Sequence, residues 1–329
     1  MKNGLVTCMV LNFLLGGCAS IDRDSGKALG NAGLTAAQAI TDVSDSARQG
    51  IDSLPEWQGA HDALSCANVQ SSNLQACINN VKSHPEEPLA ALSDVMAKRT
   101  IAAAALANAY QSYVDLATYD AGIEAENSIS HAMSAVNDLT GAVSRLAPGA
   151  PAAPISATIT TSLSWVAGFA ATTRQQQQLL AAGRDLHAAD VAMIQALTIE
   201  RDRVATESLL GVLQDERDKL FESFVDAGLI SPADALQPML TQIAPGAQIS
   251  ITSTANELAI RRAAEISLAA RSRRQQIAVK ASYDAMLGAL QALAAEHENL
   301  EAKHSLNLKG ILWHARRIQA IVADLKQQH

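Results

Sequence analysis

The chain has 329 residues, of which 48% are hydrophobic and only 3% aromatic, and its formal net charge is −8 at pH 7. This length suffices for one large domain or two small ones. Basic and acidic residues are interspersed without a basic block, which argues against nucleic acid or an anionic lipid surface as a partner. Alanine replaces the missing aromatic residues, and alanine favours helices that pack at close range.

The first 18 residues combine a positive charge, an apolar stretch and small residues before a cysteine. Lys2 precedes the apolar stretch 5–15, which leads into the sequence Leu15-Gly16-Gly17-Cys18. The stretch is shorter than the roughly 20 apolar residues that span a bilayer. A short apolar run of this kind is typical of an export signal. Together these residues resemble the signal peptide of bacterial lipoproteins.

The resemblance implies that residues 1–17 are removed and that Cys18 becomes the lipidated first residue. Diacylglycerol would be attached to its sulfur and a third acyl chain to its new amino terminus. Several acyl chains anchor a protein almost permanently, because each buried methylene contributes about 0.8 kcal/mol. Ala19 and Ser20 follow where the family's inner-membrane retention signal has Asp, so the outer membrane is expected. No cofactor is expected besides this covalent lipid.

Export also bears on the remaining cysteines. Cys8 is lost with the signal and Cys18 carries lipid, so Cys66 and Cys77 are left in an oxidising compartment. We expect a disulfide between them, which would contribute about 2–3 kcal/mol. The alternative is a pair of buried thiols.

The region 18–88 is expected to connect the anchor to the body of the protein. Residues 18–25 form a polar tether, and Gly26, Gly30 and Gly33 suggest a flexible junction. From Leu34 to Leu54 apolar residues recur at three- and four-residue steps, which predicts an amphipathic helix. Pro55 ends it, and residues 55–88 are expected to form a loop stapled by the disulfide, with one short helical piece.

Residues 89–329 are expected to form a bundle of long helices. No proline interrupts 89–146, so one helix is predicted there, and Pro148, Pro151 and Pro154 end it. A second helix should begin between 155 and 163 and run to Ala227, with Gly228 as its C-terminal cap. A short helix should follow Ser231-Pro232, and 248–252 should be extended.

The third long helix should open at Thr254, where Thr254 and Glu257 match a capping box. The heptad run 279–304 lies within it, and Asn307 and Gly310 suggest a kink before a last amphipathic helix. Helices of this length joined by compact turns must lie antiparallel. The predicted fold is therefore all-α: an elongated antiparallel helical bundle or coiled coil of three long helices, with a shorter N-terminal helix and connectors.

One group of residues has the chemistry of a metal site. His297, Glu301 and His304 are spaced to share a helical face, and imidazole with carboxylate binds divalent transition metals. A second Glu-x-x-His pattern, which a di-iron site would need, is missing. The alternative is that they are ordinary polar positions at the end of the bundle. The common nucleophile, phosphate-loop and zinc-protease motifs are absent, so no catalytic residue is assigned.

The uncharged interval 155–171 is a candidate membrane or partner contact. It carries Trp165 and Phe169, and aromatic residues suit membrane interfaces. It is superficially similar to the membrane-active tips of helical-bundle pore-forming toxins. Its many serine and threonine residues make it a poor membrane span, and a helix packed on all sides is the alternative.

Two polar belts interrupt otherwise apolar helices, at 172–178 and at 271–276. Either belt could pair across the bundle, receive an acidic partner or form a solvated face.

These patterns predict an outer-membrane lipoprotein that acts without catalysis, as a scaffold or adaptor on the periplasmic face. Its partners would be the membrane, through the lipid anchor, and other envelope proteins, with a second copy of the chain as a further option. One alternative is a membrane-perturbing or pore-forming bundle that uses 155–171. Another is a metal-binding protein or enzyme at 297–304.

Overall fold

The computed structural model describes residues 23–66, 73–81, 87–119, 122–146, 171–202, 210–234, 236–249 and 253–327. Throughout these ranges the regular structure is helical, which confirms the all-α prediction. The helices are α2 (Arg23–Asp52), α3 (Leu54–Ser65), α4 (Leu74–Asn80), α5 (Glu87–Thr118), α6 (Gly122–Leu146), α7 (Ala171–Ile199), α8 (Leu210–Asp226), α9 (Gln237–Ile243), α10 (Thr254–Glu301) and α11 (Lys309–Gln327). No helix in the described ranges combines the length and the apolar character needed to cross a membrane.

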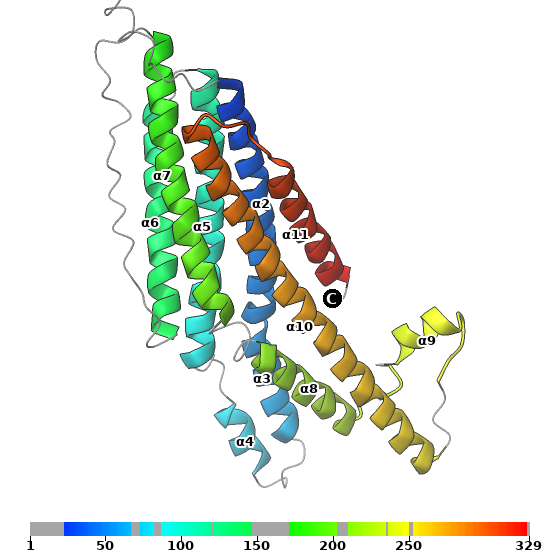
Figure 1. Ribbon diagram of the computed structural model, residues 1–329. Coiled ribbons are helices and arrows are strands. Elements are labelled where there is room, and N and C mark those ends of the chain that lie inside the picture. Colours follow the sequence, from blue (N-terminus) through cyan, green and yellow to red (C-terminus); the bar gives the residue numbers. More distant parts are fainter. Residues whose placement is uncertain are drawn as a thin grey trace, which may run out of the picture.

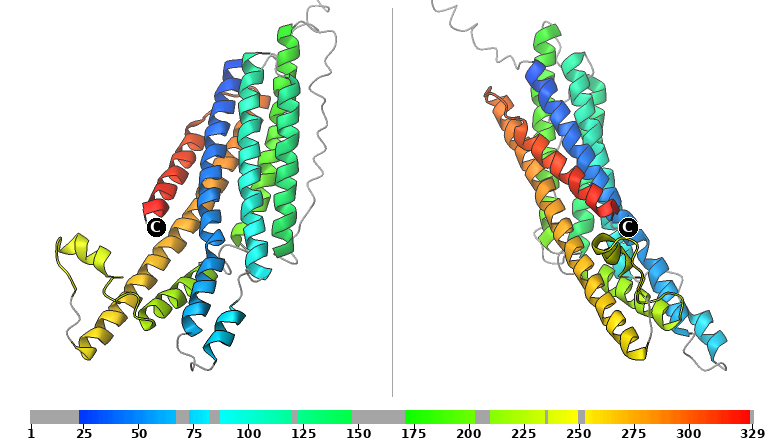
Figure 2. Two further views of the ribbon diagram at one scale, coloured as in Figure 1. Left: turned by 180° about the vertical axis from the view of Figure 1, so that it is seen from behind. Right: turned by 90° about the vertical axis from the view of Figure 1, so that its right-hand side faces the viewer.

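The main body is an elongated bundle of α2, α5, α6, α7 and the second half of α10 (Figure 1). The short helix α11 folds back against both α2 and α10. At the other end lie α3, α4, α8 and α9, together with the first half of α10, which extends beyond the bundle (Figure 2). The core is rich in alanine and leucine, and its members come from all the helices of the main body.

The three-long-helix arrangement is not confirmed, because the chain turns back inside the first predicted helix. Residues 89–146 form two helices, α5 and α6, which pack against each other. Ser112 Oγ of α5 lies 2.9 Å from Ser128 Oγ of α6 across this contact. Each helix has its own buried apolar stripe, so folding back covers both stripes at once. The absence of proline therefore did not indicate one continuous helix.

The prediction of a flexible glycine junction is wrong. α2 starts at Arg23, and Gly26, Gly30 and Gly33 lie on the face of it that contacts α5. A Cβ atom at Gly30 would be 2.7 Å from Cγ2 of Val114, which is closer than atoms can pack. Gly30 and Gly33 thus lie where α2 and α5 pack too closely for a larger side chain, whereas a Cβ at Gly26 would make only ordinary contacts, 3.7 Å from Leu179 and Tyr113.

The second predicted helix is also divided. α7 ends at Ile199, and α8 packs against α3 at the far end of the molecule rather than continuing the bundle. The predicted start between 155 and 163 lies outside the described residues. Gly228 terminates α8 as expected: its φ is +69°, and Leu229 N donates to Phe224 O over 2.9 Å.

The short connectors differ from the prediction in detail. Ser231 begins a turn rather than a helix, because Asp234 N donates back to Ser231 O over 2.9 Å. The helix α9 begins later, at Gln237, and Pro238 lies in its first turn instead of ending it. The predicted extended segment 248–252 is described only as far as 249.

The third long helix is confirmed as a single helix of 48 residues, α10. Its N-cap is Ser253, whose Oγ accepts from Asn256 N at 3.2 Å, so the cap lies one residue before the predicted Thr254. It ends at Glu301, and Lys303 adopts φ +59° before α11 begins at Lys309.

The disulfide between Cys66 and Cys77 is confirmed, with a Cα–Cα distance of 5.8 Å. It joins the end of α3 to α4, so the region predicted as a stapled loop contains two helices. Pro55 lies in the first turn of α3, directly after the end of α2 at Asp52, as the sequence predicted.

Candidate functional site

Two clusters of buried polar side chains cross the main body. The first, which we call the arginine cluster, contains Ser44 of α2, Arg99 of α5, Glu200 at the end of α7 and Tyr283 of α10. The side chain of Arg99 is 2% exposed and that of Glu200 is fully buried. Arg99 Nη1 donates to Glu200 Oε1 at 2.7 Å, and the Tyr283 hydroxyl donates to the same oxygen at 2.6 Å. One carboxylate thus links three helices.

The charges of the arginine cluster depend on each other. Burial alone would lower the pKa of Arg99, but Glu200 and Tyr283 outweigh it, so the pKa is raised and the guanidinium stays charged. Burial raises the pKa of Glu200, and the neighbouring Arg99 opposes that rise. Each charge is therefore tolerated because the other is present, which is the usual condition for buried ions.

The second cluster, the histidine cluster, contains Tyr110 of α5, Asp190 of α7 and His297 of α10. The Tyr110 hydroxyl donates to Asp190 Oδ2 at 2.6 Å and lies 3.0 Å from His297 Nε2. His297 Nε2 and Asp190 Oδ2 are 3.8 Å apart, which is long for an ion pair. Burial lowers the pKa of His297 to about 3, helped by His187, and burial raises the pKa of Asp190 well above its usual range. Burial therefore favours the neutral form of both side chains.

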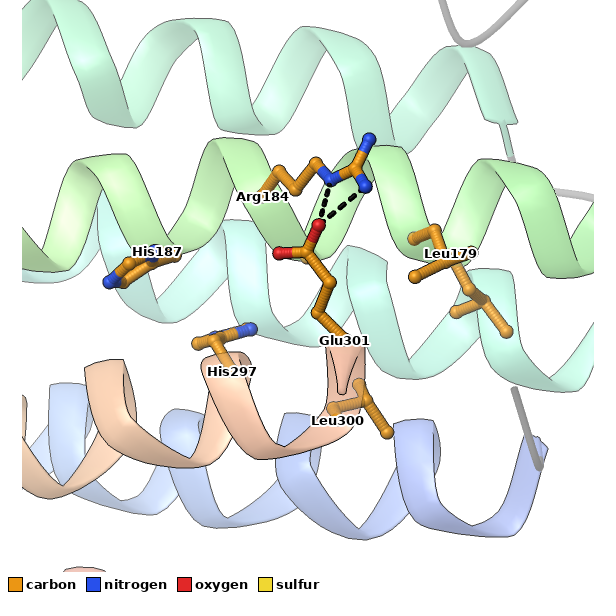
Figure 3. Close-up of a pocket in the computed structure, with 8 residues that line it drawn as sticks. Leu179, Arg184, His187, His297, Leu300 and Glu301 are labelled. Carbon is orange, nitrogen blue, oxygen red and sulfur yellow. Dashed lines mark hydrogen bonds and ion pairs between the residues drawn. The ribbon is translucent and has the colours of Figure 1, made fainter. Parts of the chain in front are cut away.

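A small pocket opens beside the histidine cluster, between α7 and α10 (Figure 3). His187 and His297 face each other across it with ring centroids 6.5 Å apart, and Arg184 pairs with Glu301 at its rim through Nε at 2.7 Å. The pocket volume is about 10 Å³, which is the space of about one water molecule. The pocket is too small for an organic substrate, which needs hundreds of cubic ångströms.

The predicted metal ligands do not come together. His297 is buried and hydrogen-bonded to Tyr110, and Glu301 forms an ion pair with Arg184. His304 is exposed and lies beyond the end of α10. The three would share one face only if the helix continued, and it ends at Glu301. In the part of the chain that the structure describes, no group of three or more His, Cys, Asp or Glu side chains is arranged to hold a metal ion.

Several other predicted site residues lie outside the described residues. These are the lipidation site Cys18 and the aromatic residues Trp165 and Phe169 of the 155–171 interval. The polar belt at 172–178 partly pairs across the bundle, since Gln175 Nε2 donates to Leu116 O at 2.6 Å. The belt at 271–276 is divided: Ser272 is buried against Arg217 of α8, whereas Arg273 and Arg274 are exposed.

Sequence reasoning missed the residues that anchor both clusters. Arg99 stands in the apolar stripe of α5, four residues after Val95 and three after Met96. Asp190 likewise follows two alanines and precedes Val191 in α7. A charged residue in the core register of an apolar helix was the available signal, because such a residue must find a buried partner.

As the pH rises above neutrality, the unmodified protein is expected to lose stability, and the Asp190→Asn variant is expected to lose less. The unfolded Asp190 ionises near pH 3.8, and burial raises its pKa well above that value in the folded protein. Above pH 6.5 His297 is neutral in both states, because its pKa is about 3 when folded and 6.5 when unfolded. The folded cluster then binds one extra proton, so the unfolding free energy falls by about 1.4 kcal/mol per pH unit until Asp190 ionises.

Urea denaturation between pH 7 and about pH 9 measures this difference. Asparagine does not titrate and still accepts a hydrogen bond from Tyr110, so the variant should lose less stability over this range than the unmodified protein. As the pH falls below 6.5, the free energy of unfolding of the variant should decrease. The reason is that His297 takes up a proton there only in the unfolded state. Parallel profiles for the two proteins would mean that the folded Asp190 is already ionised.

Comparison with known protein families, with curated proteins and with solved structures gives no match. The features that bear on function are therefore those of this chain itself: the N-terminal pattern, the disulfide, the filled interior and the exposed apolar side chains at the far end.

Proposed function

We propose that this protein is a lipoprotein anchored in the outer membrane through Cys18, and that it acts on the periplasmic side as a non-enzymatic scaffold or adaptor. The pattern Leu15-Gly16-Gly17-Cys18 supports the anchor, and the Cys66–Cys77 disulfide supports an oxidising compartment. Its partners are the membrane, through the lipid, and other envelope proteins. No cofactor is needed for this role.

The geometry of α2 orients the molecule on such an anchor. Cys18 and Arg23 are five positions apart in the chain, which allows a span of at most about 18 Å. Gly30 of α2 lies beside Val114, close to the C-terminal end of α5. The membrane-proximal end is therefore the one where α5 ends and α6 begins, and the exposed side chains of Tyr119 and Ile123 lie there.

The opposite end is the distal end, and it carries the observation on which the proposal depends. α10 alone is about 72 Å long, from 48 residues at 1.5 Å each, and it begins at that end. Large apolar side chains are exposed there, on α9, on the connectors and on the first half of α10: Leu229, Met239, Ile243, Leu258, Ile266 and Ile277. Exposed apolar side chains grouped in one region are typical of protein-binding surfaces.

The interior supports binding rather than catalysis. The buried clusters hold helices together, since Glu200 is bonded to Arg99 and Tyr283, and Asp190 is bonded to Tyr110. The pocket beside His297 has room for about one water molecule. Within the described residues, the buried ionisable groups of the two clusters therefore bond to one another across the helices.

Cys18→Ser is expected to release the protein from the outer membrane into the soluble periplasmic fraction. The serine side chain takes no diacylglycerol, so the hydrophobic anchor is lost. Cell fractionation with immunodetection measures the location, and mass spectrometry of the mature N-terminus measures the lipid. Cys8→Ser is the matched control, because the same change within residues 1–17 should leave both unchanged. Mature protein with an unmodified Cys18, or a Cys18→Ser variant still in the outer membrane, would disprove the anchor.

A further inference from the structure

The first half of α10 carries a row of exposed apolar side chains. Leu258, Ile266 and Ile277 are 64%, 58% and 69% exposed. They are eight and eleven residues apart, which is slightly more than two and three helical turns, so they lie on one side of the helix. The row extends over the part of α10 that projects beyond the main body (Figures 1 and 2).

Basic side chains lie between the apolar ones on the same side. Arg262, Arg273 and Lys280 are all exposed, at helical steps from Ile266 and Ile277. Residues 254–283 contain six basic and two acidic residues, although the whole chain has a net charge of −8. Arg262 pairs with Glu265, whereas in the ranges that the structure describes neither Arg273 nor Lys280 forms an ion pair. We call the set Leu258, Arg262, Ile266, Arg273, Ile277 and Lys280 the α10 face.

The remainder of this helix segment is held by the protein itself. Ile260 and Ala264 are buried in a small cluster with Ala233 and Leu236, and Phe221 of α8 packs against them. Further along, Ser272 is buried and bonded to Arg217 of α8. The segment is therefore held through its inner side, and the α10 face is presented outward.

We propose that the α10 face binds an acidic amphipathic helix of another envelope protein. This proposal rests on the adaptor function proposed above and names the surface and the partner's chemistry. Apolar side chains of the partner would pack between Leu258, Ile266 and Ile277, as in two-helix packing. Its carboxylates would meet Arg262, Arg273 and Lys280, which gives the contact its specificity and register.

Two other occupants fit this face less well. A second copy of the chain would place arginine and lysine of one α10 against those of the other, and like charges in an interface are unfavourable. A membrane surface would favour a wide apolar face with aromatic residues, whereas this face is a single row without Trp or Phe. The face also lies at the distal end, away from the proposed lipid anchor.

The test is site-specific photo-crosslinking in intact producing cells, with the full chain. A photoreactive residue replaces Ile266, and the crosslinked peptide is sequenced by mass spectrometry. We expect an adduct with a net acidic segment that has apolar residues at three- and four-residue steps. The triple variant Arg262→Glu, Arg273→Glu, Lys280→Glu should reduce this adduct at least about tenfold, because each new carboxylate faces an acidic partner. Replacement of the same three residues by the opposite basic residue (Arg→Lys, Lys→Arg) should retain it.

Ile101 of α5 provides the matched control position, since its side chain is also isoleucine and is 53% exposed, on the main body. Adducts with envelope proteins at Ile101 but none with an acidic segment at Ile266 would overturn this inference and leave the adaptor function intact. Absence of protein adducts at both positions would overturn both. Adducts at Ile266 with lipid, with a second copy of the chain or with a basic segment would each overturn the α10 face as an acidic-helix site.

Discussion

Glu200→Leu is expected to lower the free energy of unfolding by about 3–5 kcal/mol, because it leaves Arg99 as an uncompensated buried charge. Arg99 is 2% exposed and donates to Glu200 Oε1, so the guanidinium has no route to water when the carboxylate is removed. The Tyr283 hydroxyl, which donates to the same oxygen, also loses its acceptor. Urea denaturation followed by far-UV circular dichroism measures the change.

The double variant Arg99→Met with Glu200→Leu separates the lost charge pair from lost packing. Removing both charges takes away the desolvation cost together with the attraction, so the double variant should be clearly more stable than Glu200→Leu alone. If the double variant were as unstable as the single variant, the cost would come from packing around Glu200 rather than from the stranded arginine. A loss below about 1 kcal/mol in the single variant would show that water reaches Arg99.

Gly33→Ala is expected to destabilise the protein by about 2–3 kcal/mol, since an added methyl group overpacks the contact between α2 and α5. A Cβ atom at Gly33 would overlap the ring of Tyr110. That ring cannot move away cheaply, because its hydroxyl is bonded to Asp190 and lies 3.0 Å from His297. Urea denaturation again provides the measurement, and near-UV circular dichroism reports on the packing of the tyrosines.

Gly141→Ala in α6 is the matched control for this substitution. No atom lies within 4 Å of a Cβ placed at Gly141, so only the intrinsic helix preference changes. Alanine should therefore stabilise the protein there by about 0.5–1 kcal/mol. Equal effects of the two substitutions would show that α2 and α5 are farther apart than described.

Both predictions concern how an alanine-rich core selects one arrangement of its helices. Alanine side chains are small and alike, so helices that display them can slide past each other with little change in buried area. The arginine cluster joins α2, α5, α7 and α10, and the histidine cluster joins three of these helices at a second level. Displacement of one helix would leave buried donors and acceptors unpaired, which makes the observed register the favoured one.

Local patterns predicted most of the helical segments. The apolar steps of α2, the capping region before α10 and the positive-φ position of Gly228 each depend on residues close in sequence, and such signals do not require knowledge of the fold. The Cys66–Cys77 bridge could be predicted for a different reason: exclusion of the other two cysteines left a single pairing.

The candidate site was mostly beyond sequence reasoning. His297 was singled out, but as a metal ligand beside Glu301 and His304, because an unbroken helix was assumed. Its actual neighbours, Tyr110 and Asp190, are 187 and 107 positions away and meet it only when three helices pack. The end of α10 at Glu301 then removed His304 from the set.

The sequence by itself determined that the described parts of this chain are helical, where α2, α6 and α8 end, and which cysteines pair, since these follow from backbone preferences and local spacing. Only the tertiary structure decided that 89–146 folds back on itself, that three glycines form a contact surface, and that the first half of α10 leaves a basic and apolar face uncovered. The reason is physical: helix formation depends on neighbours within one or two turns, whereas a turn between helices, a close approach or an uncovered face depends on which distant surface is available to pack against.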